Sequence, residues 1–350
     1  MNARALIHHA LDGGRNERLP RALFGGGLWA YAQAGLLPEA LGRDHRLFAD
    51  ALSGLYRDLG TDILFLGSGL NSFPAESVGG ILRFSGPEAP LLARPLIGSA
   101  ADLRRAGTVD LQRSPRVAAL ARMIEEVRAN LPERFICATT WGPFTWAMIL
   151  CDHDLLREKL RVDRPFVTAV ADLGVRLSAS WFDLLAGRGL VDGVLVPDGA
   201  ATLISPEDYR ELVLPPQREL FARARARSLR TILHMCGQTR PQLPLYLGAG
   251  AECISVDGHV AAGEAYELYH ATTVTAGNVE AVEVIAAGEM DTIRAAVAAC
   301  VGQIADPGLR YILMPSCDLP VGTPRRNVEA FLDAADAWRT PAVECSPGQR

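Results

Sequence analysis

One histidine and two cysteines have the residue types and spacing of a metal site. His234 and Cys236 stand two positions apart in TILHMCGQ, residues 231–238, and Cys317 ends the later segment YILMPSC. An imidazole nitrogen and two thiolates are the ligands of a catalytic zinc ion, which keeps a fourth position open. Softer metals accept the same ligands, but zinc is the commoner choice for mixed nitrogen and sulfur. The plainer interpretation is a cysteine packed in a core beside a histidine bonded to a backbone carbonyl, and the residues alone leave both open.

These residues lie in a chain that alternates apolar segments with helical patterns. Eight segments are near-continuous apolar runs, as expected for strands buried on both faces of a parallel sheet: 21–27, 62–69, 135–142, 193–199, 231–237, 253–258, 273–278 and 311–317. Helical spacing or helix-start signals occupy 44–60, 116–131, 164–189 and 205–213. Eight strands alternating with helices predict an α/β fold of the (β/α)8 TIM type. A doubly wound sheet would want a G-x-G-x-x-G turn after its first strand, and GGGLWA does not match it.

The chain reads as a single domain over residues 1–350. We expect the barrel core to run from about residue 20 to 338. The segment 70–134, after the second strand, is rich in Pro and Gly in its first part and is interpreted as an insertion over the barrel mouth. Residues 340–350 are expected to be a frayed tail.

The barrel prediction gives the strand ends a functional meaning, because TIM-type active sites lie at the carboxyl ends of the strands. Strand alternation places His234 and Cys236 on one face, and barrel closure can bring Cys317 beside them. The same rule selects three candidates for substrate binding, Trp141, Asp198 and Asp257. The alternatives are a core tryptophan, a turn-capping role for Asp198, and a zinc-ligand or ligand-orienting role for Asp257.

Three further residues are candidates for cofactor binding. Gly25 and Gly26 belong to a triple glycine that suggests room for a flat ligand such as a corrin, although glycine-rich turns are common. Asn278 could hydrogen-bond a bound molecule, and the preceding Gly277 would permit a close approach.

Composition narrows the class of protein. With 49% hydrophobic residues and a formal net charge of −5, the chain has an ordinary globular composition and no clustered basic surface for nucleic acid. Its seven cysteines are scattered without a disulfide framework. The N-terminus has no signal-peptide pattern, and the most apolar window, 135–150, is interrupted and too short to span a membrane. We therefore expect a cytoplasmic location, free thiols, and no membrane or nucleic-acid partner. A second copy of the chain, in a homodimer, is a further predicted partner.

Several segments resemble the uroporphyrinogen decarboxylase superfamily. They are LHMCGQT, ECISVDGHV, VTAGNVEAVEVI, LMPSCDLPVGTPRRNVEAF, GPFTWAMIL and VLVPDGAATLISPEDYRELVLP, and the match runs from about Pro20 to Trp338. The H-x-C pair with a late cysteine is similar to the zinc-dependent methyltransferase branch, whose members move a methyl group between a corrinoid and a thiol such as coenzyme M, or from methylated substrates to a corrinoid. The resemblance implies zinc at His234, Cys236 and Cys317.

The decarboxylase branch is the alternative within the resemblance, and it needs no metal. Its R-Q-A-G-R motif binds substrate carboxylates, but AYAQAGLLPEA has Tyr31, Ala32 and Leu36 where arginines would stand. No acid occurs in GSGLNSF, where that branch has its catalytic aspartate. A polycarboxylate site without its arginines would leave charges unpaired, so decarboxylation is disfavoured.

DGHVAAG, residues 257–263, does not match the spacing of the cobalamin signature D-x-H-x-x-G. A corrinoid is therefore expected on a separate carrier protein or free, with a small methyl donor or a thiol acceptor as the other substrate. The remaining alternatives are a thiol alkyltransferase that uses no corrinoid and a binding protein that has lost catalysis.

Overall fold

The computed structural model describes residues 1–338. The predicted tail, 340–350, lies outside the described residues. Seven strands form one parallel sheet in the order β1-β4-β5-β6-β7-β8-β9. Their bounds are β1 Ile63–Leu66, β4 Phe135–Thr139, β5 Gly193–Pro197, β6 Arg230–Met235, β7 Cys253–Val256, β8 Val274–Ala276 and β9 Tyr311–Ile312. Each is a short apolar run, as a strand covered on both faces must be.

The eighth position of the ring is filled by residues 20–24, which form no regular strand. Arg21 makes an isolated parallel bridge to Leu313, just beyond β9, and Ala22 makes one to Ile63 of β1. The expected first strand, 21–27, is therefore corrected to a bridged segment, because Gly25 and Gly26 turn the chain away with φ of +57° and +67°. These pairings close the sheet into a ring, in agreement with the predicted TIM-type barrel.

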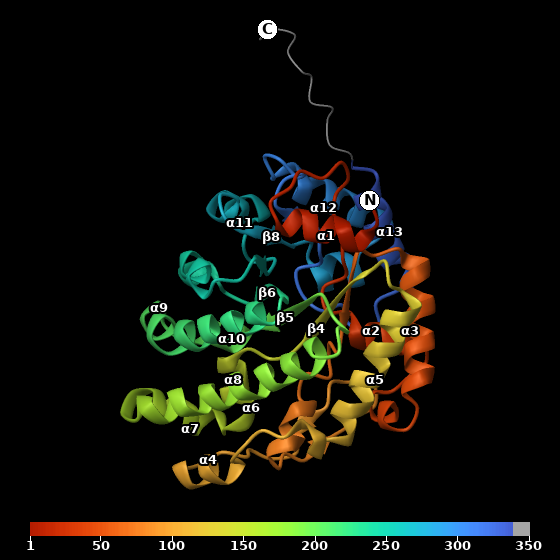
Figure 1. Ribbon diagram of the computed structural model, residues 1–350. Coiled ribbons are helices and arrows are strands. Elements are labelled where there is room, and N and C mark those ends of the chain that lie inside the picture. The colour runs from red at the N-terminus through yellow and green to blue at the C-terminus, as the bar shows by residue number, and fades with distance from the viewer. Residues whose placement is uncertain (339–350) are drawn as a thin grey trace.

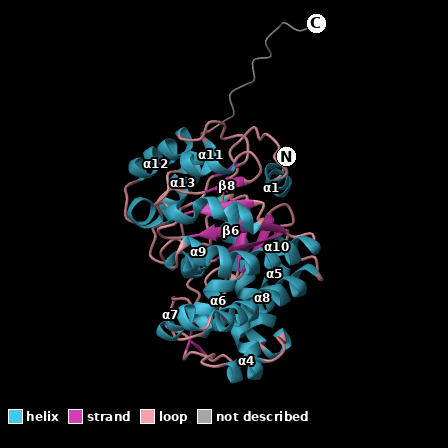
Figure 2. Cartoon of the chain, turned by 90° about the vertical axis from the view of Figure 1, so that its left-hand side faces the viewer, coloured by secondary structure: helices cyan, strands magenta, loops and turns pink. Residues whose placement is uncertain are grey.

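Helices surround this ring (Figures 1 and 2). The α-helices are α1 Ala3–Leu11, α2 Gly27–Gln33, α3 His45–Leu59, α4 Ala100–Ala106, α5 Pro115–Asn130, α6 Pro143–Leu150, α7 His153–Val162, α8 Arg164–Ala186, α9 Pro206–Asp208, α10 Leu214–Ala226, α11 Ala262–Tyr269, α12 Met290–Gly302 and α13 Arg325–Asp336. Shorter 3-10 helices are η1 Pro38–Gly42, η2 Phe73–Val78, η3 Leu111–Arg113, η4 Gly199–Leu203 and η6 Arg240–Ala249, and π-helical turns are η5 Tyr209–Val213 and η7 Ala281–Ala286. Within residues 1–338, none of the helices is long and apolar enough to cross a membrane.

The segment between β1 and β4 contains more than loop. It holds η2, an antiparallel pair of strands β2 Leu82–Arg83 and β3 Leu91–Leu92, α4, η3 and α5. Its last element, α5, packs against α3. The insertion over 70–134 stays a prediction, and the packing of α5 shows that the end of this range belongs to the helical layer.

Two apolar clusters build the interior. The larger one lies between the strands and the helices. The smaller one fills the ring with alternate residues of the strands, among them Phe65, Leu195, Ile232 and Ile312, and Cys317 packs against it. His234 follows Ile232 by two positions, so it continues the inward-facing row at the carboxyl end of β6.

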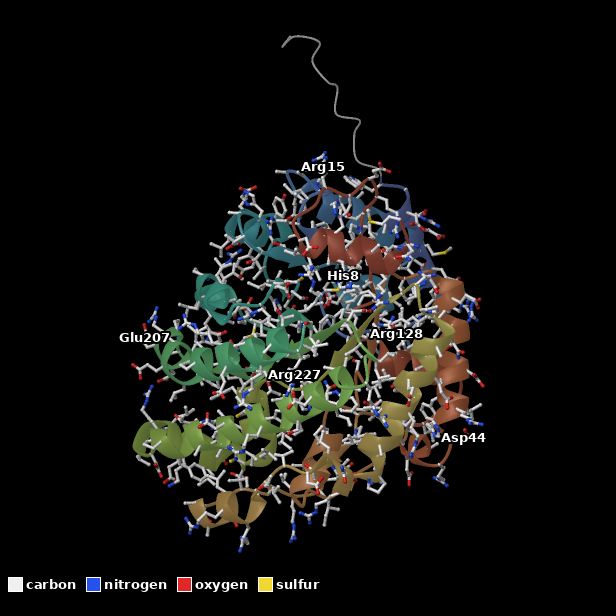
Figure 3. All side chains as sticks on the ribbon, viewed as in Figure 1. His8, Arg15, Asp44, Arg128, Glu207 and Arg227 are labelled. Carbon is white, nitrogen blue, oxygen red and sulfur yellow. The ribbon has the colours of Figure 1, made fainter. Side chains whose placement is uncertain are left out.

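Charged groups close the opposite end of the ring. Asp192, which precedes β5 and is buried, accepts hydrogen bonds from the Ile136 amide and from Arg128, and His8 of α1 lies 3.9 Å from it (Figure 3). Pairing with several donors makes a buried carboxylate tolerable. These interactions tie the amino ends of the strands together, and the carboxyl ends remain available for a functional site.

Candidate functional site

His234 is buried inside the ring and held on two sides. Its Nδ1 lies 3.0 Å from Ser255 Oγ on the neighbouring strand β7, and its ring centroid is 4.0 Å from that of Phe24. Its Nε2 is buried without a hydrogen-bond partner. Since a buried polar atom without a partner is costly, this nitrogen is a candidate ligand atom.

Cys236 follows on the same face, where β6 ends. A Cβ built on Gly199, in the loop after β5, would collide with the Cys236 sulfur. Its thiol hydrogen-bonds with Cys317, and this interaction lowers the Cys236 pKa against the opposing effects of burial and of the Asp257 charge. The glycine at position 199 thus leaves the space that the sulfur occupies.

Cys317 comes from the segment after β9. Its pKa is raised by the hydrogen bond with Cys236 and by burial, while His234 lowers it. The three predicted ligands are therefore brought together from the ends of two distant strands. Within residues 1–338, however, no group of three His, Cys, Asp or Glu side chains stands ready to hold a metal ion.

Asp198 is fully buried and belongs to the framework of the site. Its Oδ1 accepts from the Thr145 amide at the start of α6 at 2.7 Å, and its Oδ2 accepts from Gln217 Nε2 at 2.8 Å. Its own amide donates to the His234 carbonyl at 3.0 Å. Burial raises its pKa, and the hydrogen bonds from Gln217 and Thr145 oppose this. Because both of its oxygens accept hydrogen bonds, the Asp198 side chain caps α6 and not the turn that follows Asp198. In this arrangement it is not free to bind a substrate.

Removing this carboxylate should cost stability. In Asp198→Ala the Thr145 amide and the Gln217 amide lose their acceptor in a buried place, so we expect the free energy of unfolding to fall by about 2–4 kcal/mol. Asp198→Asn is the matched control, since the Gln217 side chain can turn over and bond both the new amide and the Tyr209 hydroxyl, its present partner. Urea unfolding of the two variants should separate them by more than about 1 kcal/mol, and equal midpoints would contradict the capping role.

The other predicted contact residues also have structural partners. Trp141 is half-buried and donates from Nε1 to Ser72 Oγ at 3.2 Å. Asp257 is half-buried, and its Oδ2 accepts from the Gly237 amide at 2.9 Å. Asn278 donates to the Asp257 and Val260 carbonyls at 2.9 and 2.5 Å. Of these three residues, only Asp257 acts electrostatically on Cys236. The ligand contacts proposed for Trp141, Asp257 and Asn278 stay predictions.

The carboxylate of Asp318 lies against Gly25 and Gly26. The Gly26 amide donates to Asp318 Oδ1 at 3.0 Å, and Ser68 Oγ donates to the same atom at 3.1 Å. A Cβ on Gly25 would collide with this carboxylate, whereas one on Gly26 would meet no atom closer than 3.6 Å. The space that the sequence suggested for a flat ligand is therefore filled, at Gly25, by Asp318.

Three residues of the site were missed from the sequence. They are Ser255, Gly199 and Asp318. For Asp318 a signal existed, since it follows a candidate ligand in SCDLP. For Ser255 the signal was its place on the strand next to His234, but the cross-strand register His234–Ser255 is a property of the folded sheet.

The chain is similar to known proteins over most of its length. The family described as uroporphyrinogen decarboxylase (URO-D) matches residues 7–338. The methylated-thiol–coenzyme M methyltransferase of Methanosarcina mazei is 24% identical over 275 residues, which are 78% of this chain and 72% of that protein. The methylcobamide:CoM methyltransferase MtaA of Methanosarcina barkeri is 27% identical over 242 residues, 65% of this chain and 66% of that protein, just under two thirds of its length.

A solved structure shares the fold. A methyltransferase from Methanosarcina mazei superposes with a TM-score of 0.82 at 20% identity, covering 96% of this chain and 98% of the other. A B12-independent methionine synthase from Shewanella sp. W3-18-1 gives a TM-score of 0.55 at 15% identity, over 82% and 85% of the two chains. At these identities the likeness concerns the fold.

Proposed function

This chain belongs to the uroporphyrinogen decarboxylase family, and within it we propose a zinc-dependent methyltransferase that moves a methyl group between a corrinoid and a thiol or a methylated small molecule. The observation that carries the proposal is the meeting of His234, Cys236 and Cys317 at one end of the ring. The curated relatives, named for methyl transfer to coenzyme M, support it.

The three residues fit zinc by their donor set. His234 offers an Nε2 without a partner, and Ser255 at its Nδ1 fixes the ring, as a neighbour of a metal-bound histidine does. The two thiols already contact each other. The described residues contain no ready-made group of metal ligands, so the proposal requires the ligand side chains to rearrange when zinc binds.

The chemistry follows from the ligands. Zinc, when bound, supplies a Lewis acid whose open position deprotonates a thiol or polarises a methylated heteroatom. The protein's own part is to hold His234 through Ser255 and Phe24, and to seat the Cys236 sulfur against Gly199. Two thiolates lower the effective charge of the metal, which favours sulfur as the partner.

The residues that stand in place of the arginines of the decarboxylase motif do not support decarboxylation. Tyr31 and Leu36 are buried and belong to the large apolar cluster, so substrate carboxylates would meet apolar side chains there. A corrinoid-independent thiol alkyltransferase remains the second candidate. A corrinoid carrier protein, a homodimer and a cytoplasmic location belong to the proposal, the last because the six cysteines within residues 1–338 are free thiols.

Metal removal tests the proposal directly. Purified protein should contain about one zinc per chain, and dialysis against a strong chelator should abolish demethylation of methylcobalamin by added thiols, with recovery on adding zinc. Cys236→Ser and Cys317→Ser should each lose the metal, whereas Cys151→Ser, a buried thiol away from the site, should keep it. Full metal content in both ligand variants would contradict the site, and zinc-dependent alkylation without corrinoid would favour the second candidate.

A further inference from the structure

Two carboxylates flank the thiols, and we name Asp257 and Asp318 the carboxylate pair. Each is anchored through one oxygen to a glycine amide, Asp318 Oδ1 to Gly26 at 3.0 Å and Asp257 Oδ2 to Gly237 at 2.9 Å. Their other oxygens have no protein partner in the described part of the chain. Asp318 is exposed as a residue, but burial of its carboxyl group raises its pKa, against the opposing hydrogen bonds from Ser68 and Gly26. Asp257 is half-buried.

Both charges reach the reacting end of the site. The negative charges of Asp257 and Asp318 each act on Cys236, and Asp318 also acts on Cys317. No arginine or lysine within residues 1–338 forms an ion pair with either member of the pair, so their charge is not neutralised by the protein.

A separate observation marks where a ligand approaches. The Nε2 of His234 is unpartnered inside the ring although the residue is 1% exposed, and Cys317 lies beside this histidine. The carboxylate pair therefore acts on the same side chains that a ligand of this histidine and the cysteines would meet.

We propose that the carboxylate pair makes this site select thiols and methylated substrates that are neutral or cationic near the sulfur or the methyl group, and reject those with an anionic group there. The inference rests on the proposed function for the identity of the reaction. Its physical reason is that like charges repel most strongly in a partly dehydrated site, and that such repulsion is an effective means of discrimination. We therefore do not assign coenzyme M, the acceptor named for the relatives, to this chain.

Methyl transfer from methylcobalamin to a thiol needs no further reactant. The bond between cobalt and carbon breaks with both electrons left on cobalt, which goes from Co(III) to Co(I). The bond between sulfur and carbon forms, and the proton of the thiol passes to solvent. A positive charge on the acceptor near the carboxylate pair favours its binding for this step, whereas a sulfonate or carboxylate near the thiol opposes it.

The first test uses three thiols of equal length with the zinc-loaded full chain and methylcobalamin. They are cysteamine, 2-mercaptoethanol and 2-mercaptoethanesulfonate. We expect kcat/KM for the anionic thiol to be at least about tenfold below that for the cationic thiol at low salt, with the gap narrowing as ionic strength rises. Asp318→Asn keeps an oxygen for Gly26 and Ser68, so it removes charge and not the anchor, and it should reduce the gap several-fold.

The second test needs neither zinc nor methyl transfer. Metal-free protein is treated with cystamine, 2-hydroxyethyl disulfide or the disulfide of 2-mercaptoethanesulfonate, and modification of Cys236 is followed by peptide mass spectrometry. The cationic disulfide should react fastest and the anionic one slowest, with the order weakened in Asp318→Asn and Asp257→Asn. Asp291→Asn, an exposed carboxylate on α12, is the matched control and should leave the order unchanged.

The outcomes separate the two claims. The charge selection would be overturned if rates and affinities did not depend on the charge of the reagent. It would also be overturned if the order of the rates stayed the same in both Asp318→Asn and Asp257→Asn. A clear charge order at Cys236 in a protein that transfers no methyl group would overturn the proposed function and leave the selection in place.

Discussion

Gly199→Ala is expected to cost the protein its metal ion while leaving its fold intact. The new methyl group would occupy the space of the Cys236 sulfur. The φ of Gly199 is not in the left-handed region, so alanine meets no backbone strain there. The sulfur can give way by rotating about one bond, which moves it out of the ligand set. A displacement of this size near the reacting atoms lowers turnover by about 100-fold or more.

Zinc affinity, measured by competition with a chelator of known strength, is the deciding measurement. Gly302→Ala is the control, because its Cβ would meet nothing within 4 Å. The double variant Gly199→Ala/Cys236→Ala should be as stable as Cys236→Ala alone, since the collision has gone. Unchanged zinc affinity in Gly199→Ala would show that the sulfur does not need its present position.

Gly25→Ala is expected to be far more damaging than Gly26→Ala. Both glycines have positive φ, so alanine at either costs about 1–2 kcal/mol in the backbone. Only at position 25 does the side chain also collide with the Asp318 carboxylate, which adds about 1–3 kcal/mol of overpacking and displaces the residue next to Cys317. Gly25→Ala should therefore lose stability and zinc affinity together, and Gly26→Ala stability alone.

Urea unfolding and zinc competition on the two variants test this difference. If these glycines instead make room for a corrin, the two substitutions should weaken methylcobalamin binding alike and leave zinc affinity equal. Adding Asp318→Ala to Gly25→Ala should recover part of the stability lost, since it removes the colliding atoms.

Much of the fold was predictable because parallel strands buried on both faces leave an unmistakable pattern. The runs that became β4, β5 and β6 were predicted within a few residues. The segment 21–27 was not, because its apolar residues pack inside the ring as in a strand while Gly25 and Gly26 end the pairing. Backbone turns of this kind depend on what lies opposite, here Asp318, nearly the whole chain away.

Period-two alternation and barrel closure predicted that the three candidate ligands lie at one end of the ring. The interactions of Cys317 with Cys236 and His234 agree with this, whereas their role as metal ligands stays a prediction. What the sequence did not predict was how each is held. Asp198 was expected to bind substrate or to cap the following turn, and the structure buries it at the start of α6, because the helix that it caps comes from the preceding unit of the barrel. Gly199 gave no signal, since the atom that requires it, the Cys236 sulfur, belongs to the next strand.

The bridged segment 20–24 has a consequence for how the site opens. It joins β1 to β9 by isolated bridges, so the ring is closed there by few backbone pairings, one of which, Arg21 with Leu313, joins opposite ends of the chain. Contacts of such separation form late in folding, and weakly paired regions open first in the native state. Cys317 lies just beyond this seam, so opening the seam would give the proposed metal ion a route in or out while the other strands stay paired. Exchange of the proposed zinc ion would then be faster than unfolding of the protein.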